Sequence, residues 1–276
     1  MTDVDNPILD DHIHIDPRNG RGIDAVEEFA RSGGTHLCIV NKPSWTLDVE
    51  VTEPDDFDAV FEETLATVER ASETLDGTAF AVLGVHPALV SRLVDRMPVE
   101  EAAELMRGGL DRAARLVERG RALALKSGRP HYEVDDAVWD ASNAVIRHAC
   151  RLAADRDCAL QLHTEEGTAF PDIAAMADDA GLDGDRVVKH YAAPGTGDVT
   201  SSLMARAEWI TEAIEADESF MLETDYIDDP DRPGAVLGPR TVPRRVRALA
   251  GDHPDAMHRA CVELPERIYG VEIAVD

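Results

Sequence analysis

Eight short apolar runs, most of them followed by a turn and an amphipathic stretch, organise this chain of 276 residues. The runs cover residues 7–14, 35–42, 78–86, 121–126, 158–163, 186–190, 199–205 and 219–225. Apolar residues recur at three- and four-residue spacing, which predicts helices, over 24–31, 54–75, 99–119, 136–155, 208–216, 243–251 and 254–269. Strands that alternate with helices are typical of a parallel sheet. Eight such units predict an α/β fold, a (β/α)8 TIM barrel, with residues 1–276 forming one domain.

The charge of the chain is strongly acidic, with 55 Asp and Glu against 27 Lys and Arg and a net charge of -28. Lysine occurs at three positions, Lys42, Lys126 and Lys189, and the other basic residues are arginines. This composition resembles that of proteins from salt-loving organisms, so we interpret the charge as adaptation to salt. Because about 1 M salt shortens the Debye length to about 3 Å, the charge neither supports nor excludes a nucleic acid as substrate.

The distribution of apolar residues and cysteines indicates a cellular compartment. No apolar run approaches the roughly 18 residues that cross a bilayer, and the first residues lack the basic and apolar regions of a signal peptide. The four cysteines lie inside apolar segments without CxxC spacing, which predicts buried, reduced thiols. We therefore expect a cytoplasmic protein with no membrane partner.

Candidate metal ligands stand at the ends of several predicted strands. Strand alternation places His12 and His14 on one face, about 7 Å apart, which is a metal-ligand spacing. His163, His190 and Asp225 each close a later apolar run, and the carboxyl ends of barrel strands meet in one ring. The 35 residues from His190 to Asp225 are short for two units of about 30 residues, so one unit must be compressed.

Lys126 ends the fourth apolar run, where alternation directs it toward the barrel axis. A free ammonium would be repelled by neighbouring cations, so the amine is expected to be deprotonated or chemically converted. Reaction of a neutral lysine with carbon dioxide gives a carbamate, an anion that can bridge two metal ions as a glutamate would. The alternative is an ion pair with a carboxylate such as Glu223 and no bridge.

The chain contains these ligand-type residues in the order HxH, Lys126, His163, His190 and Asp225. It also contains the segments 84–87 (GVHP), 222–226 (LETDY) and 266–270 (ERIYG). The combination resembles the TatD-related metal-dependent hydrolases of the amidohydrolase superfamily, in an archaeal and haloarchaeal subgroup. The resemblance implies a TIM barrel, two divalent cations and a metal-bridging hydroxide that attacks a phosphodiester, as in a deoxyribonuclease.

The resemblance also implies roles for individual residues. His12 and His14 would hold the buried metal ion, and His163 and His190 the outer one. Asp225 would bind the first metal ion and act as the catalytic residue that handles the proton.

One position departs from the TatD pattern, which has glutamate as the bridge on the fourth strand. Lys126 is instead the bridge of phosphotriesterase-like enzymes and their lactonase relatives. Two alternatives therefore stand beside a TatD-type nuclease: a hydrolase of a small neutral ester, and a metal-binding barrel without hydrolytic activity. The imidazoles favour zinc, while a carboxylate-type bridge also suits manganese, iron or magnesium.

Three further residues are candidates for binding a small-molecule or phosphodiester substrate. Arg129 and His131 follow Lys126 closely, and a guanidinium can form paired hydrogen bonds with a phosphate or carboxylate. His86 follows the third strand, where the resemblance suggests substrate binding. A purely structural contact is the alternative for each of these loop residues. GxSxG, Walker and dinucleotide-binding glycine motifs are absent from the sequence.

Overall fold

The computed structural model describes residues 7–232, 234 and 236–275, and eight strands form one sheet in it. All neighbouring strands are parallel, and they follow one another in chain order from β1 to β8. The strands are β1 (Leu9–Ile13), β2 (His36–Val40), β3 (Ala79–Gly84), β4 (Ala124–Gly128), β5 (Leu160–His163), β6 (Val187–Ala192), β7 (Thr200–Met204) and β8 (Phe220–Glu223). Each overlaps a predicted apolar run.

The sheet curves into a nearly closed barrel because the segment after β8 returns to β1. The backbone N–H of Asp225 donates to the carbonyl of His12 at 3.0 Å, and that of His14 donates to the carbonyl of Tyr226 at 2.7 Å. The predicted (β/α)8 TIM barrel is thereby confirmed. The closure also fixes the end of β8 beside the HxH segment of β1.

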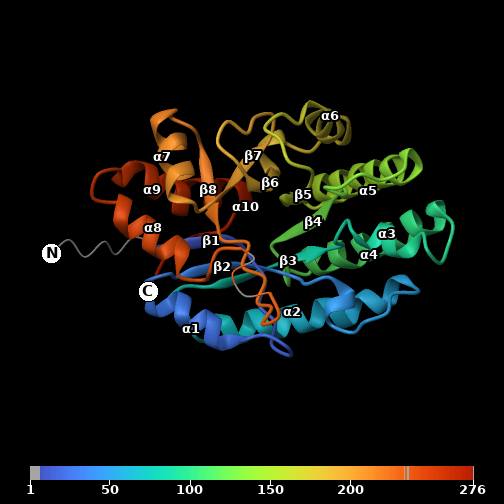
Figure 1. Ribbon diagram of the computed structural model, residues 1–276, viewed down its shortest axis with the longest axis horizontal. Coiled ribbons are helices and arrows are strands. Elements are labelled where there is room, and N and C mark those ends of the chain that lie inside the picture. The colour runs from blue at the N-terminus through green and yellow to red at the C-terminus, as the bar shows by residue number, and fades with distance from the viewer. Residues whose placement is uncertain (1–6, 233, 235, 276) are drawn as a thin grey trace.

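Helices surround the strands on the outside of the barrel (Figure 1). They are α1 (Ile23–Arg31), α2 (Phe57–Ser72), α3 (Leu89–Leu93), α4 (Val99–Glu118), α5 (Asp136–Asp155), α6 (Pro171–Ala180), α7 (Ala207–Glu215), α8 (Thr241–Leu249), α9 (Pro254–His258) and α10 (Leu264–Tyr269). A π-helical turn, Arg259–Glu263, joins α9 to α10, and short 3₁₀ turns lie at Ser44–Thr46, Pro54–Asp56 and Gly184–Arg186.

The seven helical segments expected from periodicity are present, but α3 and α6 were not predicted. Helix α3 has five residues, too few to display a helical period. Helix α6 carries the usual end signals, with Pro171 in its first turn and Gly181 in a left-handed conformation (φ 73°) after its last residue. Those two residues would have identified α6.

The compressed unit lies between β6 and β7, which are joined by residues 193–199 without a helix. Parallel strands are usually joined by a longer crossover with a helix. This short connection accounts for the close sequence spacing of His190 and Asp225.

The barrel interior below the strand ends is filled by apolar side chains. Buried residues from the strands and their edges form this layer: Leu9, Cys38, Val40, Val82, Ala124, Ala159, Val188 and Met221. Leu264, Ile268 and Tyr269 of α10 pack against the same layer. All four cysteines are buried and free, as expected.

In the part of the chain that the structure describes, no helix is both long and apolar enough to cross a bilayer. Residues 1–6, the first residues that were compared with a signal peptide, lie outside the described residues.

Candidate metal centre

The two histidines of the HxH segment present one ring nitrogen each to the same space. Nδ1 of His12 donates to the side-chain oxygen of Gln161 at 2.7 Å, and Nδ1 of His14 donates to the carbonyl of Val40 at 2.8 Å. Both acceptors are carbonyl oxygens, so the proton of each neutral ring is on Nδ1. Nε2 of each ring therefore keeps a lone pair for a metal ion.

Asp225 completes a set of three ligand groups at the junction of β8 and β1. Its backbone has φ 49°, a left-handed conformation that is uncommon for a residue other than glycine. Its carboxylate oxygen Oδ1 lies 3.8 Å from Nε2 of His14. One ligand atom from each of His12, His14 and Asp225 lies within 4.8 Å of the other two. Two imidazoles and a carboxylate are suitable ligands for a divalent cation.

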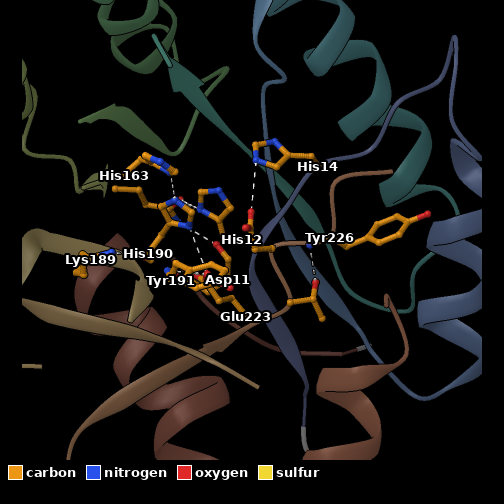
Figure 2. Close-up of polar contacts among 12 residues, drawn as sticks. Asp11, His12, His14, His163, Lys189, His190, Tyr191, Glu223 and Tyr226 are labelled. Carbon is orange, nitrogen blue, oxygen red and sulfur yellow. Dashed lines mark hydrogen bonds and ion pairs between the residues drawn. The ribbon is translucent and has the colours of Figure 1, made fainter. Parts of the chain in front are cut away.

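His163 at the end of β5 and His190 in β6 adjoin this set. Nδ1 of His163 lies 2.8 Å from Nε2 of His190, and the His190 ring stacks on that of His12 with 4.0 Å between ring centroids. Figure 2 shows the three rings lying together, with His14 across from them. Three histidines of β1, β5 and β6 thus meet His14, the residue that follows β1, at one end of the barrel.

A buried carboxylate orients His190 from behind. Oε1 of Glu223 lies 3.3 Å from Nδ1 of His190 and accepts the backbone N–H of Tyr191 at 2.7 Å (Figure 2). Tyr191 has φ 56° and lies within β6, where the register of pairing with β7 shifts between Lys189 and Ala192. Carboxylates that accept from the second nitrogen of a metal-binding histidine hold the ring in place and raise its basicity.

Lys126 projects from β4 into the same group of side chains. Its Nζ lies 2.8 Å from Nε2 of His12, and the residue is 3% exposed. Burial lowers the pKa of the Lys126 amine to about 8, although the charge of Asp225 acts in the opposite direction. In the part of the chain that the structure describes, no ion pair joins Lys126 to Glu223. The Lys126 amine is therefore easier to deprotonate than an ordinary lysine, and it lies close to the ligand groups.

Burial also sets the charge of the ligand groups. It lowers the pKa of His12, His14, His163 and His190 well below the ordinary value, so these rings are neutral at pH 7. Burial raises the pKa of Asp225 to about 6, against the opposing charge of Lys126. Neutral imidazoles beside a carboxylate fit a divalent cation, since a metal ion binds the neutral form of the ring and not the protonated one.

A second layer of hydrogen bonds lies beneath the histidines. The side-chain amide of Gln161 donates to the carbonyl of Asp11 at 2.9 Å and to the hydroxyl of Tyr269 at 2.8 Å. That hydroxyl donates to the carboxylate of Asp11 at 2.7 Å. Tyr269 of α10 therefore supports Gln161, which in turn orients His12.

A cavity of about 600 Å³ opens above these groups at the carboxyl ends of the strands. Its lining includes His14, Asp16, Lys42, Trp45, His86, Lys126, His131, His163, His190, Asp225 and Arg232. This volume suits a small-molecule substrate.

Of the three residues expected to contact a substrate, two line the cavity and one does not. His86 and His131 face it, and Nδ1 of His131 lies 2.8 Å from Nε2 of His163. Arg129 is 3% exposed, and its guanidinium donates to Glu165 (2.7 Å for Nε) and Asp172 (2.5 Å for Nη1). The contacts of Arg129 therefore join β4 to the segments after β5, which corresponds to the structural alternative for this residue.

Comparison with known proteins shows the family to which the chain belongs. The family model described as TatD related DNase matches residues 9–270. An uncharacterized protein of Methanocaldococcus jannaschii, MJ1127, is 34% identical over 281 residues, which cover 97% of each chain. The chain belongs to the TatD-related DNase family. It is therefore a hydrolase by family, with a cluster of His and Asp side chains suited to a divalent metal ion.

Solved structures share the fold at low sequence identity. The TatD-like protein of Archaeoglobus fulgidus has a TM-score of 0.60 at 18% identity, over 95% of this chain and 100% of that one. A mutant PTE-like lactonase of Deinococcus radiodurans also has a TM-score of 0.60, at 14% identity over 95% of each chain. The TatD family member described here thus shares its barrel with both groups.

Two side chains that support this TatD-family site, Gln161 and Glu223, were not predicted in these roles. Gln161 stands two residues before His163, and Glu223 two residues before Asp225. Strand alternation places residues two apart on the same face, and this rule also pairs His12 with His14. The same rule applied to β5 and β8 would have found both supporting residues.

Proposed function

We propose that this TatD-family protein is a dinuclear metal-dependent hydrolase that cleaves a phosphodiester. The observation that supports the proposal most strongly is the convergence of His12, His14 and Asp225 within 4.8 Å, with Nδ1 of both histidines already donating to carbonyl oxygens. His163 and His190 adjoin this set and supply the ligands for a second ion. Two divalent cations would lower the pKa of a water molecule and neutralise charge on the scissile group.

Asp225 is the residue that moves the proton in this proposal. Its carboxylate is buried at the edge of the cavity, and its Oδ1 lies 3.8 Å from Nε2 of His14. A general base must lie within reach of the proton that it accepts. Oδ1 of Asp225 would accept the proton of the attacking water and return it to the leaving oxygen.

Lys126 would serve as the bridge between the two ions as a carbamate. The neutral amine attacks carbon dioxide, forms the N–C bond and loses one proton to give the anion. The position of its Nζ, 2.8 Å from Nε2 of His12, supports this role because it places the amine beside a proposed ligand of the first ion. Zinc is the first candidate metal, and manganese, iron and magnesium are alternatives.

Hydrolysis of a small neutral ester is the second candidate function. The specific observation that favours it is the lysine at position 126, since the bridging residue resembles that of the phosphotriesterase-like enzymes and lactonases. The structural similarity to a PTE-like lactonase concerns the barrel alone.

A substrate panel separates the candidates. The purified protein, in concentrated salt to suit its acidic composition, is assayed with phosphodiester, lactone and amide substrates after addition of zinc or manganese. We expect metal-dependent turnover of a phosphodiester. Turnover of the lactone alone would favour the second candidate, and two bound metal ions without any turnover would indicate a barrel that only binds metal.

A further inference from the structure

Lys42 is a cavity-lining cation that has no part in the proposed metal centre. It stands two residues after β2, and it lines the same cavity as His14, Lys126 and Asp225. It is one of three lysines in a chain whose other basic residues are arginines. The residue is 8% exposed.

Asp16 holds the Lys42 ammonium in place from below. Oδ2 of Asp16 accepts from Nζ of Lys42 at 2.6 Å, and Oδ1 accepts the backbone N–H groups of Arg18 and Asn19 at 2.9 Å each. The backbone N–H of Asp16 donates to Oδ2 of Asp228 at 2.8 Å. This network joins the loops after β1, β2 and β8, so the ammonium is fixed rather than extended into solvent.

The ammonium keeps donors available for a ligand. An ammonium has three N–H donors, and within the described residues the one acceptor bonded to Lys42 Nζ is Asp16. Both side chains line the cavity, and that of Lys42 is 10% exposed against 1% for Asp16, so the cation is the more accessible member of the pair. A fixed ammonium above a metal centre is suited to bind an anionic oxygen.

The other charged side chains of the cavity make this cation distinctive. Asp228, Asp229, Asp231 and Arg232 line it from the loop after β8 and together contribute two net negative charges, and Asp16 and Asp225 are further acidic lining residues. If Lys126 becomes a carbamate, as proposed above, Lys42 is the lysine that still presents a positive charge to the cavity. A chain with a net charge of -28 otherwise repels anions, so a local cation is needed to retain one.

We propose that Lys42 binds a non-bridging anionic oxygen of the substrate and thereby selects small phosphodiester monoanions over neutral esters of the same size. This inference rests on the proposed hydrolase function and names the substrate class for that site. Lys42 is a specificity-determining residue in this account, and Asp16 is the residue that positions it.

The test compares two esters that differ in one charge. Bis(4-nitrophenyl) phosphate is a monoanion, and its methyl ester is a neutral triester of nearly the same shape. The kcat/KM of metal-loaded wild-type protein is compared with that of Lys42→Gln, Lys42→Arg and the control Arg96→Gln. Arg96 is an exposed residue paired with Glu50, and its replacement removes one positive charge away from the metal centre.

We expect Lys42→Gln to lower kcat/KM for the anionic ester about tenfold, mainly through KM, while the neutral ester changes less than about twofold. Lys42→Arg should recover most of the loss, and Arg96→Gln should match the wild type. The ratio of the two esters within one preparation does not depend on the folded fraction. Equal changes for both esters, or no change for either, would overturn the role of Lys42.

If the metal-loaded wild type hydrolyses neither ester, the proposed function fails but Lys42 is still tested. Equilibrium dialysis then gives Kd for the same two compounds. Weakened binding of the anion alone by Lys42→Gln would support the inference, and unchanged binding of the anion would contradict it.

Discussion

Gln161 on β5 accepts a hydrogen bond of 2.7 Å from Nδ1 of His12 on β1, across the interior of the barrel. The contact fixes which nitrogen of His12 carries the proton. It also connects the metal centre to α10, since the Gln161 amide donates to the hydroxyl of Tyr269. The geometry of the candidate site therefore depends on residues outside the set of candidate metal ligands.

Gln161→Leu should weaken metal binding by about 10- to 100-fold, because Nδ1 of His12 loses its acceptor and the ring loses its fixed orientation. A titration against a competing chelator measures this affinity. Gln161→Glu keeps an oxygen that can accept from His12 but loses the amide donor to Asp11 and Tyr269, so its affinity should lie between those of the wild type and the leucine variant. Equal affinities in the wild type and the leucine variant would show that this hydrogen bond does not orient the ligand.

Lys126→Ala should lose one of two bound metal ions together with activity, and short carboxylic acids should partly restore both. The added carboxylate would occupy the space of the proposed bridge. Lys126→Arg is the matched control, because arginine keeps the positive charge and cannot form the carbamate. Metal analysis after dialysis gives the stoichiometry, and an arginine variant with two ions would contradict the bridge.

Glu223→Gln should separate stability from metal binding. Oε2 of Glu223 is buried and has no hydrogen-bond partner among the described residues, and burial raises the pKa of this carboxyl well above its usual value. Replacement by a neutral amide should therefore leave the free energy of unfolding of the metal-free protein unchanged or higher. Metal affinity should fall by about 10-fold or more, since His190 loses its carboxylate partner. Urea unfolding measures the free energy of unfolding, and metal titration measures the affinity. A variant that loses both stability and metal affinity would contradict this prediction.

Asp10→Asn should change how stability depends on pH. Burial raises the pKa of Asp10 from 3.8 to about 7, although hydrogen bonds from Thr224 oppose the shift. Between these two pH values the folded wild type holds a proton that the unfolded chain releases, so this group lowers stability as the pH rises from about 4 to about 7.

The asparagine variant lacks that ionisation. Its free energy of unfolding relative to the wild type should therefore increase by about 2 kcal/mol between pH 5 and pH 8. Urea unfolding of the metal-free proteins at the two pH values tests this expectation. A difference that is the same at both pH values would show that the folded-state pKa of Asp10 does not lie between pH 5 and pH 8.

The strands and most helices could be predicted because their signals are local. A run such as 158–163 carries its own periodicity, and the strand end that places His163 near the other ligands follows from the barrel rule. The environment of Arg129 could not be predicted in this way. Its partners Glu165 and Asp172 lie 36 and 43 residues away, and no local pattern indicates which side of β4 the guanidinium takes.

The cavity side chains show the same limit of local patterns. The rarity of lysine marks Lys126, which lies in β4, and the same argument applies to Lys42, which follows β2. The sequence does not show that Asp16 lies beside Lys42, because their contact joins two different loops. Partners of this kind become visible only when the loops are placed in space.

The central claim is that His12, His14, His163, His190, Asp225 and Lys126 hold two metal ions at one end of the barrel. Anomalous diffraction from a crystal grown with zinc or manganese tests it most directly. We expect two peaks, one beside His12, His14 and Asp225 and one beside His163 and His190, with extra density on Lys126 Nζ between them. Absence of peaks at these residues, or peaks at other positions only, would contradict the account.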